Sequence, residues 1–267
     1  RQMCIRDRAY ADQQVTVSRS LVIAGHPEAV RLGTQVLAQG GTAADALVTT
    51  SLAVGFAEPG NSGPGGKMVM LYYEASTKKV YSIVAMDQSA LKLDVEKVLK
   101  NKPGKRGYDA VCTPGLVAGL EAAHKQWGSK HWKNLVEPVA KLANDGFVLT
   151  PMAAEMMGEF PVDVDAEAAK IFAPGGKSFK TGDRYRNPDY AATMHTLAVE
   201  GPRSFYEGTI AKKLAEGFAK AGSPIELEDF KTYKARVIEP LHGNAAGYEV
   251  FTSCLLYTSP SPRDATL

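Results

Sequence analysis

The sequence predicts an α+β fold in which an early β-hairpin is preceded and followed by helices. Three observations lead to this prediction. Two helical patterns meet at a glycine pair, Gly40 and Gly41. Two apolar segments, residues 68–73 and 80–85, are joined by a short polar stretch, as in a hairpin. Several segments after residue 113 then carry helical boundaries or apolar residues at helical spacing. No internal linker or repeat is visible, so one domain is expected.

The first elements are predicted from their ends. The apolar run at residues 21–24 predicts a strand. Pro27 opens the first helix, at a position where its missing N–H has no cost, and the glycine pair ends it. Thr42 and Asp45 fit a capping box for the second helix. That helix, residues 43–56, is almost entirely small or apolar, which predicts burial on most of its surface.

A glycine-rich stretch, Glu-Pro-Gly-Asn-Ser-Gly-Pro-Gly-Gly, follows at residues 58–66. Backbone N–H groups of such loops can bind phosphate. However, neither phosphate-loop spacing is present, and the order is helix–loop–strand rather than strand–loop–helix. We therefore interpret Gly60, Gly63, Gly65 and Gly66 as a tight structural turn that needs positive φ at several residues.

The later elements are predicted from proline and glycine boundaries. A basic, polar connection is expected over residues 92–105. Helices are expected from the Thr-Pro-Gly at residues 113–115 to residue 127, and over residues 132–144, 151–158, 188–200, 208–221 and 225–234, with a strand at residues 250–251.

Composition excludes several classes of protein. The 267 residues carry a net charge of +2, with 45% apolar and 22% charged residues. This balance gives no basis for nucleic-acid binding. The longest small-apolar run, residues 43–57, is too short to span a membrane.

No catalytic or metal site follows from residue spacing alone. The five histidines are scattered, so neither a metal nor another cofactor is expected. Cys112 precedes a helix start, where a thiol can be activated, but we interpret it as a buried small residue. Asp163, Asp165 and Glu167 are interpreted as solvated carboxylates of a loop.

Both ends of the chain resemble translations of opposite strands of one transposon-based sequencing adapter. The stretches are residues 1–8 and 254–267, which hold Cys4 and Cys254. We therefore expect these ends to be artefacts and residues 9–253 to be an incomplete domain. Poor packing of both ends is also expected.

The order of several passages resembles the γ-glutamyltranspeptidase family, and the similarity covers residues 17–252. The matching passages are His26-Pro27-Glu28-Ala29, the Gly-Gly-Thr-Ala-Ala-Asp-Ala at residues 40–46, the glycine turn with its strand, the Thr-Pro-Gly-Leu-Val-Ala-Gly at 113–119, and the segments at 205–211, 228–230 and 247–250.

The resemblance implies the large-subunit part of an N-terminal nucleophile hydrolase, a four-layer αββα sandwich. Members are precursors that cleave themselves, and the new N-terminal threonine of the small subunit is the nucleophile. They move the γ-glutamyl group of glutathione to water or an amino acid. The implied partners are a γ-glutamyl substrate and the protein's own small subunit. No catalytic residue is expected in this chain, which is therefore expected to be inactive alone.

One position departs from the family pattern. An Arg-Glu pair is expected after the second hairpin strand, and its arginine binds the substrate carboxylate. Met86 and Asp87 stand there instead. Either the substrate differs, or another cation such as Lys67 or Lys92 supplies the charge.

Two other functions stay open: a sister acylase or amidase with a different substrate, and a catalytically inactive binding relative. The family and the Ala9-Tyr10-Ala11 triplet, which resembles the end of a signal peptide, favour a periplasmic or secreted protein.

Overall fold

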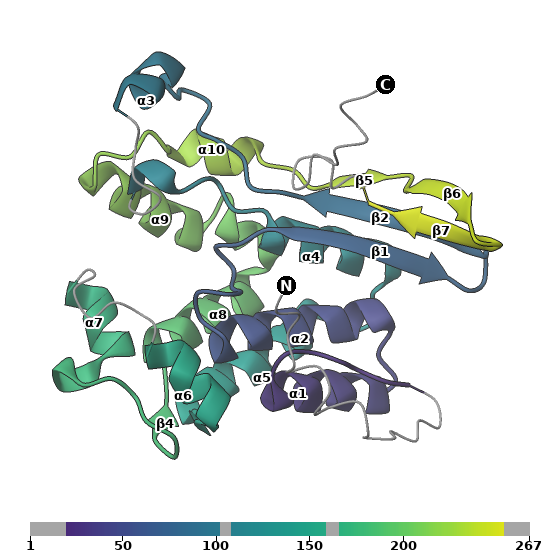
Figure 1. Ribbon diagram of the computed structural model, residues 1–267, viewed down its shortest axis with the longest axis horizontal. Helices are drawn as coiled ribbons and strands as arrows, with labels where there is room; N and C mark the ends of the chain where they lie inside the picture. Colours follow the sequence, from purple (N-terminus) through teal and green to yellow (C-terminus); the bar gives the residue numbers. More distant parts are fainter. Residues whose placement is uncertain (1–19, 102–107, 159–165, 254–267) are drawn as a thin grey trace.

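The computed structural model describes residues 20–101, 108–158 and 166–253, in which a sheet lies along one side of a layer of helices (Figure 1). The helices are α1 (Pro27–Ala38), α2 (Ala43–Ala57), α3 (Val95–Asn101), α4 (Leu116–Trp127), α5 (Trp132–Asp145), α6 (Pro151–Gly158), α7 (Ala166–Phe172), α8 (Pro188–Glu200), α9 (Thr209–Lys220) and α10 (Leu227–Thr232). The strands are β1 (Met68–Glu74), β2 (Lys79–Ala85), β3 (Phe147–Val148), β4 (Arg184–Tyr185), β5 (Arg236–Ile238), β6 (Leu241–Ala245) and β7 (Tyr248–Thr252).

The main sheet is antiparallel, with β2 between β1 and β5. The β1–β2 register runs from Met68 opposite Ala85 to Glu74 opposite Lys79. This arrangement confirms the predicted hairpin. β6 and β7 form a second antiparallel hairpin, and β3 pairs with β4.

Helix α4 packs closely against one face of the β1–β2 hairpin. A Cβ atom on Gly119 would lie 2.6 Å from Cε of Met68 and 2.9 Å from Cβ of Ala85. At the other end of the helix, the rings of Tyr72 and Trp127 stack with their centroids 4.2 Å apart. Small residues near its N-terminus and an aromatic pair near its C-terminus therefore fix α4 along the sheet.

Helix α2 lies at the centre of the helical layer, and most of its residues are buried, as predicted. Its backbone accepts one hydrogen bond from α8, and one of its side chains donates a hydrogen bond to the backbone of α5. Tyr190 Oη donates to the carbonyl of Leu52 at 2.8 Å, and Thr49 Oγ1 donates to the carbonyl of Leu135 at 2.8 Å. The small residues of α2 therefore let neighbouring helices approach closely enough for these bonds.

The predicted starts of α1 and α2 are confirmed, as are the helices at α4, α5, α6, α8 and α9 and the strand at β7. The strand predicted at residues 21–24 is wrong. These residues have no strand partner among the described residues, and Val22 instead lies beside Gly33 of α1. The segment predicted as a basic, polar connection, residues 92–105, contains the short helix α3. Helix α10 is shorter than the predicted helix at residues 225–234. The loop predicted around Glu167 is wrong at that residue, because α7 includes it.

Among the described residues, no helix combines the length and the hydropathy needed to cross a bilayer. The adapter-like ends at residues 1–8 and 254–267, together with Asp163 and Asp165, lie outside the described residues.

The buried carboxylate of Asp45 ties the start of α2 to the turn between α4 and α5. It accepts from the backbone N–H of Thr42 at 2.9 Å, which completes the predicted capping box. It also accepts from the hydroxyl of Ser129 at 2.8 Å and from the backbone N–H groups of Ser129 and Lys130. Burial alone would raise the pKa of Asp45, but these hydrogen bonds outweigh it, so the pKa lies below its usual value.

Replacing this carboxylate should destabilise the protein. In the whole protein, Asp45→Ala removes the acceptor of several part-buried N–H groups and leaves a cavity at a buried position, so we expect a loss of about 1–3 kcal/mol in the free energy of unfolding at pH 7. Because the folded-state pKa is lowered, the contribution of Asp45 is present above the unfolded pKa of about 3.9. It is lost as the pH falls through the lower folded value. Urea unfolding followed by circular dichroism at several pH values measures this.

The matched control is Asp145→Ala, which removes an exposed carboxylate paired with Lys141 on the same helix. We expect little change in stability from it. Equal losses for the two variants at pH 7 would contradict the role given to Asp45.

Candidate substrate-binding site

The segment that leaves β2 is fixed beside the start of α4. Gln88 and Thr113 exchange two backbone hydrogen bonds: Gln88 N–H donates to Thr113 at 3.0 Å, and Thr113 N–H donates to Gln88 at 2.8 Å. Met86 and Asp87 lie between the end of β2 and this bridge. Their backbone is therefore held on both sides, at the end of the sheet from which α4 begins.

The glycine turn provides a hydrogen-bond acceptor for the backbone N–H groups at the N-terminus of α4. The N–H groups of Gly115 and Leu116 both donate to the carbonyl of Gly66, at 2.9 and 3.0 Å. No side chain caps this helix, so the Gly66 carbonyl accepts hydrogen bonds that a capping residue would otherwise accept. The turn therefore joins α2, β1 and α4 in one place.

Positive φ occurs at two of the four glycines named from the sequence. Gly60 has φ of 86° and Gly63 has φ of 155°, whereas Gly65 and Gly66 are not in this region. Close approach is a second reason for glycine, because a Cβ atom on Gly55 of α2 would lie 2.7 Å from the Cα of Gly63. The sequence pattern thus predicts where the turn is, but not which glycine has which role.

A tyrosine from the end of α10 fixes the backbone of Met86. Tyr233 Oη donates to the Met86 carbonyl at 2.5 Å, and the Tyr233 ring stacks on that of Tyr206. Burial, and next the negative charge of Asp87, raise the pKa of Tyr233 to about 12. The hydroxyl therefore keeps its proton at neutral pH and stays a donor.

The positive charge at this site comes from Lys67, the residue that follows the glycine turn. Its Nζ lies 3.1 Å from Oδ1 of Asp87, and both side chains are partly exposed, at 53% and 38%. The ammonium has three donors and the carboxylate can accept several hydrogen bonds. Each member of this pair can therefore bind another polar group while the two remain together.

Lys92, the other cation considered from the sequence, is held elsewhere. Its Nζ lies 2.8 Å from Oε2 of Glu226, the residue that precedes α10. The structure therefore separates the two lysines: Lys67 is paired with Asp87, and Lys92 is paired with α10.

Cys112 lies close to the same pair. Burial raises the pKa of its thiol, the charge of Asp87 raises it further, and the charge of Lys67 partly opposes this. The thiol is therefore protonated at neutral pH and is not an activated nucleophile. It is half-buried, and so more exposed than the interpretation as a buried residue implied.

The other polar candidates do not gather here. Across the described ranges, no histidine is hydrogen-bonded to a serine, threonine or cysteine side chain; His124, for example, contacts the carbonyl of Lys130. Within the same residues, no group of three or more histidine, cysteine or acidic side chains could hold a metal ion.

Sequence reasoning missed Tyr233. It lies 147 positions from Met86, and nothing in the local sequence connects the two. Lys67 was considered beside Lys92, and the hairpin register supports it, because Met68 lies opposite Ala85 and Lys67 and Met86 are the next positions on the two strands. Only the return of the chain after α10 makes Tyr233 a neighbour of the Met86–Asp87 segment.

Comparison with known proteins gives consistent matches. The sequence model of the gamma-glutamyltranspeptidase family matches residues 29–258. Glutathione hydrolase 3 of Arabidopsis thaliana is 32% identical over 240 residues, which cover 88% of this chain and 38% of that protein. The glutathione hydrolase proenzyme of Bacillus subtilis is 31% identical over 250 residues, or 90% of this chain and 43% of the relative. The acylase ACY 1 proenzyme of Pseudomonas sp. (strain V22) is 29% identical over 259 residues, or 92% and 46%.

Among solved structures, the γ-glutamyltranspeptidase of Helicobacter pylori superposes with a TM-score of 0.85 at 26% identity. The match covers 92% of this chain and 72% of that chain. The chain spans about four-tenths of the full length of the two glutathione hydrolases compared above.

The glycine contacts at this site predict a contrast between two alanine variants of the whole protein. A Cβ atom on Gly115 would lie 2.2 Å from the Ala85 carbonyl oxygen and 2.2 Å from Tyr233 Oη. We therefore expect Gly115→Ala to lower the free energy of unfolding by about 2 kcal/mol or more. Gly65 has no atom within 4 Å of its Cβ position, so Gly65→Ala should change stability by less than about 0.5 kcal/mol.

Thermal and urea unfolding of both variants measure this contrast. A Gly115→Ala protein as stable as Gly65→Ala would show that the close approach at the start of α4 is not required.

Proposed function

The chain belongs to the gamma-glutamyltranspeptidase family, and we propose that the whole protein moves γ-glutamyl groups from glutathione-like amides to water or amino acids. The observation that carries this proposal is the Lys67–Asp87 pair. It places a cation and an anion at the end of β2, where the family pattern expects an arginine followed by a glutamate.

A γ-glutamyl group has charges that match this pair. Its α-carboxylate is negative and its α-ammonium is positive, so Lys67 is suited to bind the first and Asp87 the second. Met86 offers neither charge, and its carbonyl already accepts from Tyr233. Lysine presents a compact charge on a flexible stem, whereas arginine presents a planar fork. We therefore expect carboxylate binding that is weaker and less demanding in geometry than an arginine would give.

In this proposal the chemical step is acyl transfer by a self-cleaving precursor. The N-terminal threonine of a small subunit attacks the γ-amide carbon, and its own amine takes the proton. The threonine's amine passes this proton to the amide nitrogen, the bond from that nitrogen to the γ-carbon breaks, and water or an amino acid then attacks the acyl-threonine and releases the acyl group. The role of the present chain is to hold the α-carboxylate and α-ammonium so that the γ-carbon reaches that threonine.

The outer side of the sheet supports a small-subunit partner. On β1, Leu71 and Tyr73 alternate with the residues that face α4, and both are exposed, at 44% and 60%. A second sheet laid on this side would bury Leu71 and Tyr73, as an αββα sandwich requires. We propose that the small subunit supplies that sheet.

A second candidate function is an acylase acting on an amide without the α-carboxylate. Met86 favours it, because a thioether in place of an arginine removes the usual partner of the carboxylate. One of the similar proteins is also named as an acylase proenzyme. A binding relative without catalysis is the third. For localisation, we propose export to the periplasm or the exterior, on the basis of the family and of residues 9–11.

Expression of the whole gene in a bacterial host distinguishes these functions. Our proposal predicts two polypeptides on a denaturing gel and release of nitroaniline from γ-glutamyl-p-nitroanilide. Self-cleavage with release only from plain acyl anilides would support the acylase. An uncleaved, inactive protein would support the binding relative.

Lys67 is the residue whose change is most informative. In the self-processed protein, Lys67→Met should raise KM for γ-glutamyl-p-nitroanilide about tenfold or more, because it removes a charge-assisted contact. The stem of methionine keeps much of the lysine packing. Steady-state kinetics measure this effect.

Lys92→Met is the matched control, because Lys92 is also exposed and paired with a carboxylate, but away from Asp87. It should leave KM within about twofold. Equal effects of the two variants would contradict the assignment of Lys67.

A further inference from the structure

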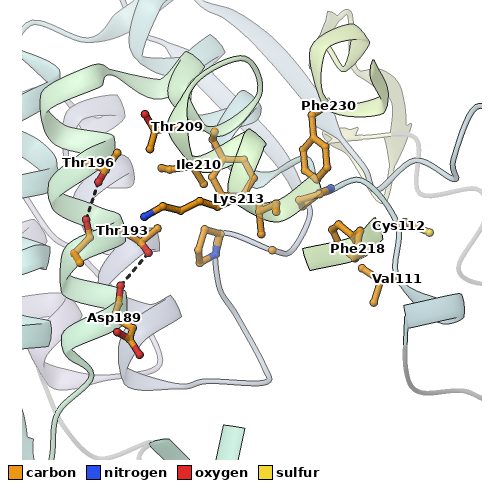
Figure 2. Close-up of a pocket in the computed structure, with 16 residues that line it drawn as sticks. Val111, Cys112, Asp189, Thr193, Thr196, Thr209, Ile210, Lys213, Phe218 and Phe230 are labelled. Atoms are coloured by element: carbon orange, nitrogen blue, oxygen red, sulfur yellow. Dashed lines mark hydrogen bonds between the residues drawn. The ribbon is translucent and has the colours of Figure 1, made fainter. Parts of the chain in front are cut away.

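A half-open pocket of about 450 Å³ lies between α8 and α9 and is closed at one side by residues 64–65 and 111–114 (Figure 2). This volume lies in the range of pockets that bind small molecules. Figure 2 shows α8 on one side of it, with Asp189, Thr193 and Thr196, and Phe218, Phe230 and Val111 on the other. The two sides differ in chemistry.

The side opposite α8 is apolar. Phe218 of α9 is partly exposed and Val111 extends the same surface. The buried ring of Phe230 of α10 supports Phe218 from behind, with the two ring centroids 6.2 Å apart. Val111 is exposed, so part of this surface faces solvent in the pocket. Such a wall binds hydrocarbon or aromatic groups, because contact removes apolar area from water.

The hydroxyl groups on the polar side are already used as donors. Thr193 Oγ1 donates to the carbonyl of Asp189 at 2.9 Å, and Thr196 Oγ1 donates to the carbonyl of Ala192 at 3.0 Å. Thr209 Oγ1 donates to Glu200 at 2.8 Å. A ligand with many hydroxyl groups, such as a sugar, would therefore find few free donors here.

Lys213 supplies the available cation. Figure 2 shows its side chain reaching from α9 across the pocket toward Thr193 and Thr196. In the part of the chain that the structure describes, its ammonium has no ion pair with a carboxylate. Asp189 also lines the pocket and makes no ion pair within that part. The ammonium of Lys213 would therefore attract a bound anion. The carboxylate of Asp189 would repel it, and this repulsion falls as the distance between the anion and Asp189 increases.

We propose that this pocket binds a small amphipathic monocarboxylate, with its carboxylate on Lys213 and its apolar body against Phe218 and Val111. One uncommitted cation beside an extensive apolar wall matches one anionic group on a hydrocarbon or aromatic body. It does not match a polyanion or a polyol. The proposal rests on the pocket itself, and it holds whether or not the protein transfers γ-glutamyl groups.

The probe is 4-phenylbutyrate, titrated calorimetrically into the whole protein at low ionic strength. For a ligand of this size we expect a Kd on the order of 1 mM or lower. The neutral analogue 4-phenylbutan-1-ol should bind at least about fivefold more weakly, because it lacks the charge. Acetate, which has the charge but no apolar body, should give no measurable binding.

Three variants locate the site. Lys213→Met should weaken 4-phenylbutyrate about tenfold and leave the alcohol unchanged, whereas Lys212→Met, on the same helix but outside the pocket, should change neither. Asp189→Asn should tighten 4-phenylbutyrate about two- to threefold at low salt, because it removes a like charge. Ala192→Phe should abolish binding of both ligands, since it adds a ring to the pocket lining.

Circular dichroism confirms that each variant is folded before titration. Absence of 4-phenylbutyrate binding to the folded whole protein would overturn the proposal, including the case in which another part of the protein fills the pocket. Equal effects of Lys212→Met and Lys213→Met would overturn it as well, as would binding that survives Ala192→Phe.

Discussion

The close contact between the glycine turn and the start of α4 is the constraint on which the candidate site depends. The Gly66 carbonyl accepts two N–H groups from the beginning of the helix, so the end of the turn and the helix cannot move independently. Gly115 has no Cβ, and the Ala85 carbonyl and Tyr233 hydroxyl occupy the space that a side chain would need. The start of β1, the end of β2 and the end of α10 therefore meet at the start of α4, and Lys67 and Asp87 are paired beside it.

The sequence predicted most of the fold because the signals that start and end its helices are local. Proline at the start of α1, the capping box at Thr42 and Asp45, and the glycine after α5 each act within a few residues, and each is found in the structure. The expected N-terminal nucleophile hydrolase fold is also confirmed by the likeness to a solved γ-glutamyltranspeptidase. The error at residues 21–24 has a physical reason: a strand needs a partner strand, and a short apolar run can equally pack on a helix, as Val22 does beside Gly33.

The candidate site was less predictable, because it is made by contacts between distant segments. The position of Met86 and Asp87 at the end of β2 followed from the hairpin. The choice between Lys67 and Lys92 was left open, although a register with Met68 opposite Ala85 places Lys67 next to Met86. The pairing of Lys92 with Glu226 depends on a distant segment and could not be predicted from the hairpin. In our proposal, the positively charged position is moved from the end of β2 to the residue before β1, while Asp87 keeps an acidic side chain in place. On that proposal, a family member can lack the expected arginine and still present both charges.

The central claim is that Lys67 and Asp87 together bind the charged end of a γ-glutamyl group. A crystal structure of the self-processed protein with bound glutamate tests it most directly. The account predicts the Lys67 ammonium within about 3 Å of the ligand α-carboxylate, with Asp87 beside the α-ammonium and Met86 making no polar side-chain contact. A carboxylate bound by other residues, with Lys67 still paired only to Asp87, would contradict it.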